Sequence, residues 1–342
     1  MTLIIDSNVY WLPQAFFNDG HIRKQFLAEI SADEDTKATF KKSDSDLVIN
    51  IEKPIGQPSL DYFASDYKLG AQLADMETGH VDKAVLKAPG CQEWMSLDLC
   101  KLYNKNIAKY IDDSHGRMVA LAVVPPYGHE AELAELDHCI HDLGLKGVQV
   151  SAHYGDKYLD DMSFRPFLSH VEKLGIPVYV HHTPVPVEYA SIKDYANFRR
   201  SYGRCADQII AVSREVFSNL FAELPHLKMV HSMLGGGYFT YKDMFIPHDS
   251  GKGRFDTNTA DQIEQRLNQN IYFEMSHAQP WGPENLKVAI KKLGSKKVIY
   301  GSSYPVKQVW MTKGPEYMQE LGLDSRDFDA VLGENAKRIY QC

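Results

Sequence analysis

Short apolar runs alternate with longer amphipathic stretches along this chain, and the alternation recurs about eight times. The short runs are rich in Val and Ile without polar alternation, which is typical of strands buried on both faces of a parallel sheet. The stretches between them, such as Ser96–Asp113 and Glu130–Leu143, repeat apolar residues at helical spacing. The predicted strands are Leu3–Asn8, Lys83–Lys87, Met118–Val124, Gly147–Ser151, Pro177–His181, Lys228–Ser232, Ile271–Met275 and Val298–Ser302.

Alternating strands and helices indicate βαβ units with right-handed crossovers. Eight such units predict a closed (β/α)8 barrel, a TIM barrel, in a single α/β domain over residues 1–342. A doubly wound open sheet is the alternative. Two segments interrupt the rhythm: an insertion after the first strand, at about residues 11–67, and a long loop at about residues 238–269. Because both follow strands, we expect both on the face where a barrel keeps its active site, unless they only decorate the surface.

Composition narrows the class of protein. The net charge of −8 argues against a nucleic-acid partner, and no apolar run is long enough to span a membrane. The five cysteines are scattered and form no CxxC, which argues against a disulfide framework or a structural zinc site. The N-terminus has no basic segment followed by an apolar one, so we expect a cytoplasmic protein that meets small molecules.

Three stretches carry a family resemblance: His115–Val150, Ile290–Val306 and Leu332–Tyr340. In their order and spacing, the chain resembles the amidohydrolase-related family that includes aminocarboxymuconate semialdehyde decarboxylase and other non-oxidative decarboxylases and hydratases. The resemblance runs from residue 1 to about residue 340. It implies a TIM barrel of the metal-dependent-hydrolase type, a small cyclic or unsaturated carboxylate as substrate, and a homodimer.

The resemblance also implies a metal site, and this chain departs from it. Members open with Asp-x-His-x-His, whose two imidazoles bind one metal. The matching stretch here is DSNVY at residues 6–10, so Asn8 and Tyr10 stand at the two histidine positions. His181 keeps a third ligand position, whereas Ser303 stands where the family has an Asp and Met233 where it has an acid–base His. Because Asn, Tyr and Ser are poor zinc ligands, we expect no cofactor and a metal-independent enzyme.

The polar residues at the expected barrel mouth define a candidate site. His181 is predicted to shuttle a proton, while hydroxyl and amide groups hold a substrate oxygen as negative charge develops. An Arg from the segment after the fifth strand is predicted to bind the carboxylate. The predicted catalytic residues are His181, Tyr10, Ser303 and His153, and the predicted substrate-binding residues are Asn8, His182, Arg199, Arg204 and Tyr304.

These residues favour a lyase, acting by decarboxylation, hydration or carbon–carbon cleavage, or a hydrolase of an activated ester or lactone. Two alternatives stay open. The chain is a non-catalytic relic that binds a small molecule or a partner, or it is a metalloenzyme with an altered ligand set. In the second case a divalent ion such as zinc is held by His181 with His153 or His231.

Overall fold

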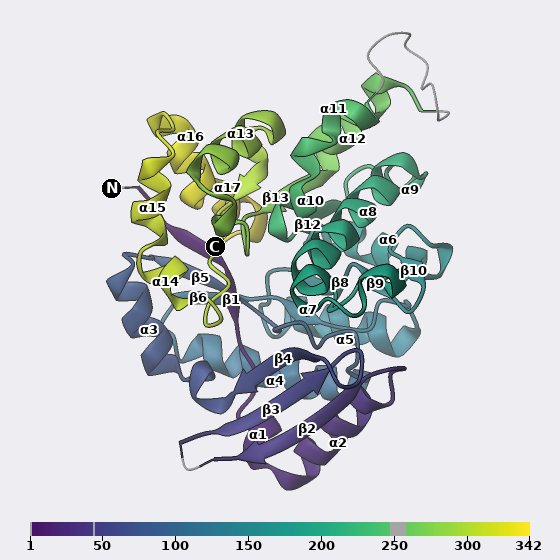
Figure 1. Cartoon of the computed structure of the whole chain (residues 1–342), viewed down its shortest axis with the longest axis vertical. Coiled ribbons are helices and arrows are strands. Elements are labelled where there is room, and N and C mark those ends of the chain that lie inside the picture. Colours follow the sequence, from purple (N-terminus) through teal and green to yellow (C-terminus); the bar gives the residue numbers. More distant parts are fainter. Residues whose placement is uncertain (1, 44, 247–257) are drawn as a thin grey trace.

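Eight barrel strands, all parallel to their neighbours, close the predicted barrel (Figure 1). The computed structural model describes residues 2–43, 45–246 and 258–342. The third barrel strand is split into two short pieces. The barrel strands are β1 (Ile5–Tyr10), β5 (Lys83–Lys87), β6 (Met118–Ala120) with β7 (Ala122–Val123), β8 (Val148–Ser151), β11 (Pro177–His181), β12 (Lys228–His231), β13 (Ile271–Glu274) and β14 (Val298–Ile299).

The barrel closes between its first and eighth strands. Val9 pairs with Tyr304 in a parallel bridge, and the backbone N–H groups of Ser7 and Ser303 donate to Tyr300 and Asn8. The lower interior is apolar and ends on the C-terminal helix. This cluster contains Ile5, Val85, Leu121, Tyr179, Val230, Tyr272, Ile299, Ala336, Ile339 and Tyr340. It fixes the strands from below, so that their carboxyl ends form a rigid floor for a site.

Helices surround the barrel, as the periodicity predicts. The principal ones are α3 (Leu69–Thr78), α4 (Leu97–Asp112), α5 (Glu130–His141), α6 (Arg165–Leu174), α8 (Arg204–Phe217), α9 (Leu220–Glu223), α13 (Pro283–Leu293), α14 (Gln308–Thr312), α15 (Gly314–Glu320), α16 (Ser325–Asp329) and α17 (Asn335–Tyr340). Short segments join them: α7 (Ala196–Phe198), α10 (Met233–Gly237), and 3-10 or π turns at η2 (Met162–Phe164), η3 (Ala190–Ile192), η4 (Arg199–Gly203), η6 (Gln279–Trp281), η7 (Ser295–Lys297) and η8 (Ala330–Glu334). A small hairpin, β9 (His153–Tyr154) with β10 (Lys157–Tyr158), follows the fourth barrel strand.

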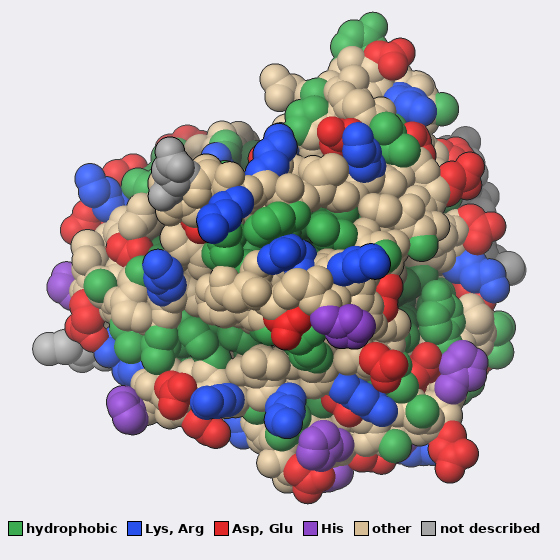
Figure 2. Space-filling model, turned by 90° about the horizontal axis from the view of Figure 1, so that it is seen from below, with side chains coloured by type: hydrophobic (Ala, Val, Ile, Leu, Met, Phe, Trp, Pro, Cys, Tyr) green, Lys and Arg blue, Asp and Glu red, His purple; other side chains and the backbone are tan. Residues whose placement is uncertain are grey.

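The segment after β1 folds into a subdomain of its own, which lies at one end of the molecule in Figure 1. It contains α1 (Ala15–Asn18), α2 (Gly20–Ser31), an antiparallel sheet of β2 (Lys37–Lys42), β3 (Leu47–Glu52) and β4 (Pro58–Phe63), and η1 (Ala64–Tyr67). Seen from the side of this sheet, Lys, Arg, Asp and Glu side chains are interspersed (Figure 2). Over the described residues visible there, no broad patch of one charge sign forms.

The predicted loop at residues 238–269 is partly helical. It contains η5 (Tyr238–Thr240), α11 (Lys242–Phe245) and α12 (Ala260–Asn270), while residues 247–257 lie outside the described part of the chain. Thr259 caps α12 by accepting from Gln262 N, whose side chain returns a bond to the Thr259 backbone. No helix in the described ranges is long and apolar enough to cross a membrane.

Candidate active site

A local irregularity in β1 directs its polar side chains into the barrel. Strand side chains alternate in direction, so Lys87, His181 and Glu274 share the interior side with the apolar residues two positions before them. The pairing of β1 with β5 shifts register between Asp6 and Val9. A bulge of this kind changes which residues face inward, and both Asn8 and Tyr10 bond to interior side chains.

A closed hydrogen-bond network forms the floor of the mouth. The Asn8 amide Nδ2 donates to Tyr179 Oη (2.6 Å) and to Glu274 Oε2 (2.9 Å), and the Tyr179 hydroxyl donates to the same carboxylate oxygen at 2.8 Å. Ser276 N donates to the other oxygen, Glu274 Oε1, at 2.6 Å. A Cβ on Gly301 would lie 1.9 Å from Glu274 Oε1, so glycine is required where the eighth strand passes this carboxylate.

Lys87 lies beneath this floor as a buried cation. Its Nζ is 3.3 Å from the centroid of the Tyr179 ring and has no hydrogen-bond partner among the described residues. Burial lowers the pKa of Lys87 to about 7, although Glu274 and Asp6 favour its charged form. Lysines without a partner are rarely buried, because burying the charged amine lowers the stability of the folded state.

Tyr10 and His181 meet above the floor, as the sequence predicted for the mouth. Tyr10 Oη is 3.0 Å from His181 Nε2, and it lies 3.5 Å from Nε2 of His277, which follows β13. His182 stacks on His181 with ring centroids 4.1 Å apart and meets His277 edge-on at 5.4 Å. Three imidazoles and one phenol therefore gather at the carboxyl ends of β1, β11 and β13.

The backbone fixes the tautomer of His181. Its Nδ1 lies 2.6 Å from the carbonyl oxygen of His182, which can only accept, so Nδ1 carries the hydrogen. Nε2 is then the acceptor, and the Tyr10 hydroxyl donates to it. Burial, followed by Arg204 and Lys87, lowers the pKa of His181 to about 3, while burial raises the pKa of Tyr10 well above its usual value. The proton of this pair therefore rests on Tyr10.

Arg204, the first residue of α8, is a charge that acts on the same group of rings. Its Nε and Nη2 atoms are buried and lack hydrogen-bond partners within the described ranges. Its charge adds to burial in lowering the pKa of His181, His182 and His277. Burial and then Arg200 lower the pKa of Arg204 itself to about 10, although Tyr10 and Tyr62 favour its protonated form. A buried guanidinium without a partner leaves its donors available, and a carboxylate is the ligand that these donors match best.

Three of the predicted site residues have other partners. The ring nitrogens of His153 lie 2.8 Å from the Gly155 oxygen and 3.1 Å from the Val185 oxygen. Arg199 is buried and donates to the carbonyl oxygens of Lys193 and Pro58, which ties η3 to β4. The Tyr304 hydroxyl donates to Asp75 of α3, outside the barrel. The structure therefore does not bring these three side chains to the Tyr10–His181 pair.

Ser303 lies in the mouth, where it positions backbone. Its Oγ accepts from His277 N at 3.0 Å, and its own N–H donates to the Asn8 carbonyl. Asp6 has a related role: its Oδ1 accepts from the backbone N–H groups of Asn8 and Ser302. Burial raises the pKa of Asp6 to about 7. The Ser303 hydroxyl thus joins the end of the eighth strand to the segment after the seventh, and the Asp6 carboxyl joins the first strand to the eighth.

Sequence reasoning missed His277, Lys87 and Glu274. Each stands at or just after the carboxyl end of a barrel strand, in KAVLK or IYFEMSH. Their position at the end of a barrel strand could have marked them as site residues, but none of the three belongs to a motif. His231, considered above as a metal ligand, faces outward and binds Glu215 and Gln208 of α8 at 2.7 and 3.0 Å.

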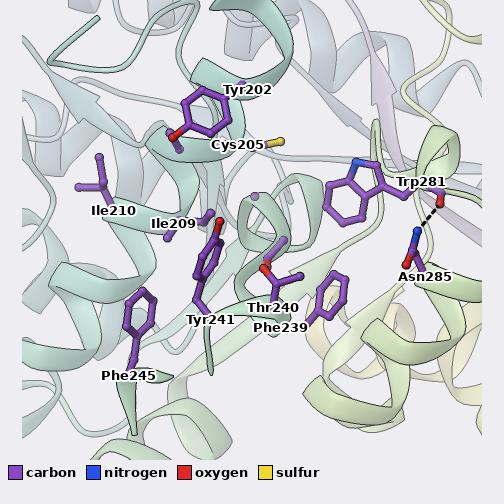
Figure 3. A pocket seen from close by; sticks show the side chains of 13 residues that line it. Tyr202, Cys205, Ile209, Ile210, Phe239, Thr240, Tyr241, Phe245, Trp281 and Asn285 are labelled. Atoms are coloured by element: carbon purple, nitrogen blue, oxygen red, sulfur yellow. Dashed lines mark hydrogen bonds between the residues drawn. The ribbon is translucent and has the colours of Figure 1, made fainter. Parts of the chain in front are cut away.

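A large apolar cavity lies between the start of α8, η5 and η6 (Figure 3). Its volume is about 720 Å³, and Figure 3 shows Tyr202, Tyr241, Phe239 and Trp281 around it. None of the described residues that line it is charged, so it offers no counterion for a carboxylate. The charge of Arg204 acts on the Tyr10–His181 pair instead.

The donor set does not match the family's metal site. The amide nitrogen of Asn8 donates to Glu274 and Tyr179, the Tyr10 hydroxyl donates to His181 Nε2, and the Ser303 hydroxyl accepts from the His277 backbone N–H. Over the described residues, no group of three or more His, Cys, Asp or Glu is arranged to hold a metal ion. Loss of the family's ligands remains a prediction from the sequence.

The closed barrel fold is shared with solved structures. A 5-carboxyvanillate decarboxylase from Sphingomonas paucimobilis superposes with a TM-score of 0.76 at 19% identity, covering 100% of this chain and 99% of that one. A dihydroxybenzoic acid decarboxylase from a Polaromonas species, with bound manganese and 2-nitroresorcinol, gives 0.70 at 16% identity over 100% and 97%. These similarities confirm the predicted fold.

The chain belongs to the amidohydrolase family, because the model of that family matches residues 92–342. Among curated proteins, a 2-amino-3-carboxymuconate-6-semialdehyde decarboxylase from Dictyostelium discoideum is 29% identical over 61% of this chain and 57% of its own length. A gamma-resorcylate decarboxylase from a Rhizobium species is 22% identical over 72% and 77%. The chain thus spans little more than half of the first of these relatives.

Proposed function

We propose that this protein is a decarboxylase of a small aromatic or cyclic unsaturated carboxylate. The observation that carries the proposal is Arg204, whose Nε and Nη2 atoms are buried without hydrogen-bond partners among the described residues and whose charge acts on Tyr10, His181 and His277. The curated relatives are named as decarboxylases of such acids, which supports the same reaction class. Hydration, hydrolysis and a non-catalytic relic gain no comparable support.

The proposed reaction breaks the bond between the ring carbon and the carboxylate carbon. The electron pair of that bond stays on the ring carbon, which takes up a proton as carbon dioxide leaves. Arg204 holds the carboxylate, and the Tyr10–His181 pair keeps the neighbouring His277 in place by its hydrogen bonds. The mouth must therefore supply one proton to carbon in each turnover.

His277 is the proposed source of that proton. Burial lowers its pKa to about 3, followed by the charges of Arg204, His181, Lys307 and Arg200. A bound carboxylate offsets those cations, so substrate binding raises the pKa of His277 and favours its protonated form. His277 is partly exposed, which lets solvent return the proton after each cycle.

Whether a metal takes part divides the proposal into two forms. The donor set of Asn8, Tyr10 and Ser303 supports the metal-independent form expected from the sequence. The manganese-containing relative favours the second form, a metalloenzyme with an altered ligand set. For this form His181 and His277 are the imidazoles to consider, because both direct Nε2 toward Tyr10 Oη.

The test is turnover of a panel of aromatic carboxylates by the full chain, followed as carbon dioxide release with metal content measured in the same sample. The proposal expects release that depends on Arg204. Tight binding of these acids with no release would contradict it and favour the relic. Release that a chelator abolishes and manganese restores would select the metalloenzyme form.

A further inference from the structure

A second pocket lies between η6, α14 and α15, outside the site described above. Its volume is about 420 Å³, which is within the size range of small-molecule sites. Trp310 forms part of its wall, and the ring of Trp310 also meets His277 edge-on with centroids 6.3 Å apart. The pocket therefore borders the barrel mouth through one shared side chain.

Hydrogen bonds to neighbouring elements hold the walls of this pocket in place. The Tyr300 hydroxyl donates to the Trp310 carbonyl. Gly314 leaves room for this hydroxyl, since a Cβ there would lie 2.0 Å from Tyr300 Oη. The Tyr317 hydroxyl donates to the Gln279 carbonyl at 3.3 Å, which joins α15 to η6. The pocket is therefore formed by the fold itself, as sites for small molecules usually are.

One wall of the pocket carries a hydrogen-bond acceptor that has no partner. Gln279 lines the pocket and is only 7% exposed, and its Nε2 donates to the Gly301 carbonyl at 2.9 Å. Because a carbonyl can only accept, this bond fixes the orientation of the amide. The other atom of the amide, Oε1, is buried without a hydrogen-bond partner among the described residues. A buried acceptor of this kind lowers stability, and a ligand with a donor would satisfy it.

Two exposed carboxylates that line the pocket also lack partners. Glu316 and Glu320 stand four residues apart on α15, so their side chains lie on one face of the helix. In the part of the chain that the structure describes, neither forms an ion pair or a side-chain hydrogen bond. Like charges at this spacing repel each other. Lys313 is the one cation among the described lining residues, so the lining keeps a net negative charge.

We propose that this pocket binds an aromatic amine. The ring of the amine lies against Trp310 and Tyr317, and its ammonium group is held by Glu316 and Glu320. An ammonium group matches this lining because it donates hydrogen bonds, carries the opposite charge and is attracted to aromatic faces. Gln279 Oε1 accepts from a donor on the ring, such as an indole N–H. This site is separate from the proposed decarboxylation and does not depend on it.

The experiment is calorimetric titration of the full chain with tryptamine and with its neutral analogue, indole-3-ethanol. The variants are Glu316→Gln, Glu320→Gln and Lys313→Gln, and Glu284→Gln is the control. Glu284 and Glu316 are both exposed and both stand in the first turn of a helix, but Glu284 does not line the pocket. We expect wild type to bind tryptamine about tenfold more tightly than the alcohol, as two exposed ion pairs together provide.

Each carboxylate variant should weaken tryptamine binding about threefold and change indole-3-ethanol binding less than about twofold. Lys313→Gln should instead tighten tryptamine binding about twofold, because it removes the opposing cation, and Glu284→Gln should leave it unchanged. Equal affinity of wild type for the two ligands, or no binding of tryptamine, would overturn the inference. Tryptamine binding that the carboxylate variants leave unchanged would also overturn it, since the amine would then occupy another site, such as the cavity in Figure 3. These titrations need no turnover, so their outcome is independent of carbon dioxide release.

Discussion

The hydroxyl of Tyr10 donates to Nε2 of His181 across 3.0 Å, because Nδ1 of the same ring is held by the His182 carbonyl at 2.6 Å. The direction of this bond is thus set by backbone. Burial, followed by the charges of Arg204 and Lys87, maintains it, since all three disfavour a protonated His181. The mouth therefore holds a neutral phenol–imidazole pair.

Tyr10→Phe tests this pair. The variant leaves His181 Nε2 without its donor and His277 without its neighbour, so we expect decarboxylation to fall by about 100-fold. Tyr62→Phe is the matched control, because its hydroxyl is also buried and donates to the Pro89 carbonyl, outside the mouth. Each variant should lose roughly 1–2 kcal/mol of unfolding free energy. Equal activity of the two variants would contradict the role of Tyr10.

Arg204→Gln should weaken carboxylate binding by about tenfold or more, since it removes the charge and most of the free donors. The fold should be retained, because the Nε and Nη2 atoms of Arg204 hold no protein group. Arg199→Gln should leave carboxylate binding unchanged but lower the melting temperature, because it breaks the bonds to the Lys193 and Pro58 carbonyls. Titration calorimetry and thermal melts separate the two, and unchanged affinity in Arg204→Gln would refute the proposed anchor.

Lys87 makes stability depend on pH. Its pKa falls from 10.5 in the unfolded chain to about 7 in the folded one, so the unfolded state binds more protons between those values. The penalty is complete below pH 7 and disappears as the pH rises toward 10.5. In Lys87→Met this rise in unfolding free energy should be missing, whereas Lys83→Met, on the same strand, should retain it. Denaturant melts at several pH values measure the difference; identical profiles for wild type and Lys87→Met would show that the amine is not a buried cation.

Gly301→Ala tests the packing of the floor. The new Cβ would lie 1.9 Å from Glu274 Oε1 and 2.9 Å from Asn8 Cβ, so the Glu274 network must move. We expect a loss of about 2–3 kcal/mol in unfolding free energy together with reduced activity. Gly70→Ala on α3 meets no atom within 4 Å and should be neutral or gain about 0.5 kcal/mol. Comparable stability of the two variants would argue against the close contact.

The fold could be predicted because buried parallel strands leave an unbroken apolar pattern. The ends of the strands were harder to predict: the eighth strand was predicted as Val298–Ser302, but β14 ends at Ile299. Beyond it, Ser302 and Ser303 leave the ladder and bond Asp6 and Asn8 of the first strand. Such long-range bonds have no signature in a local pattern.

The site was predicted in part. Tyr10 and His181 could be found because a family pattern marks both positions. His153 and Arg199 follow the right strands, yet loop conformation turns them toward backbone carbonyls. His277 belongs to no motif, and only its distance to Tyr10 reveals it. Direction of a side chain in a loop is set by tertiary contacts, which a single sequence does not display.

The most direct test of the account is release of labelled carbon dioxide from carboxyl-labelled benzene-1,3-dicarboxylate and hydroxybenzoates by the purified full chain. We predict release by the wild-type protein and a loss of about 100-fold in Arg204→Gln with an unchanged melting temperature. No release from any of these acids, in protein that binds them through Arg204, would contradict a decarboxylase and leave a binding protein on an amidohydrolase barrel.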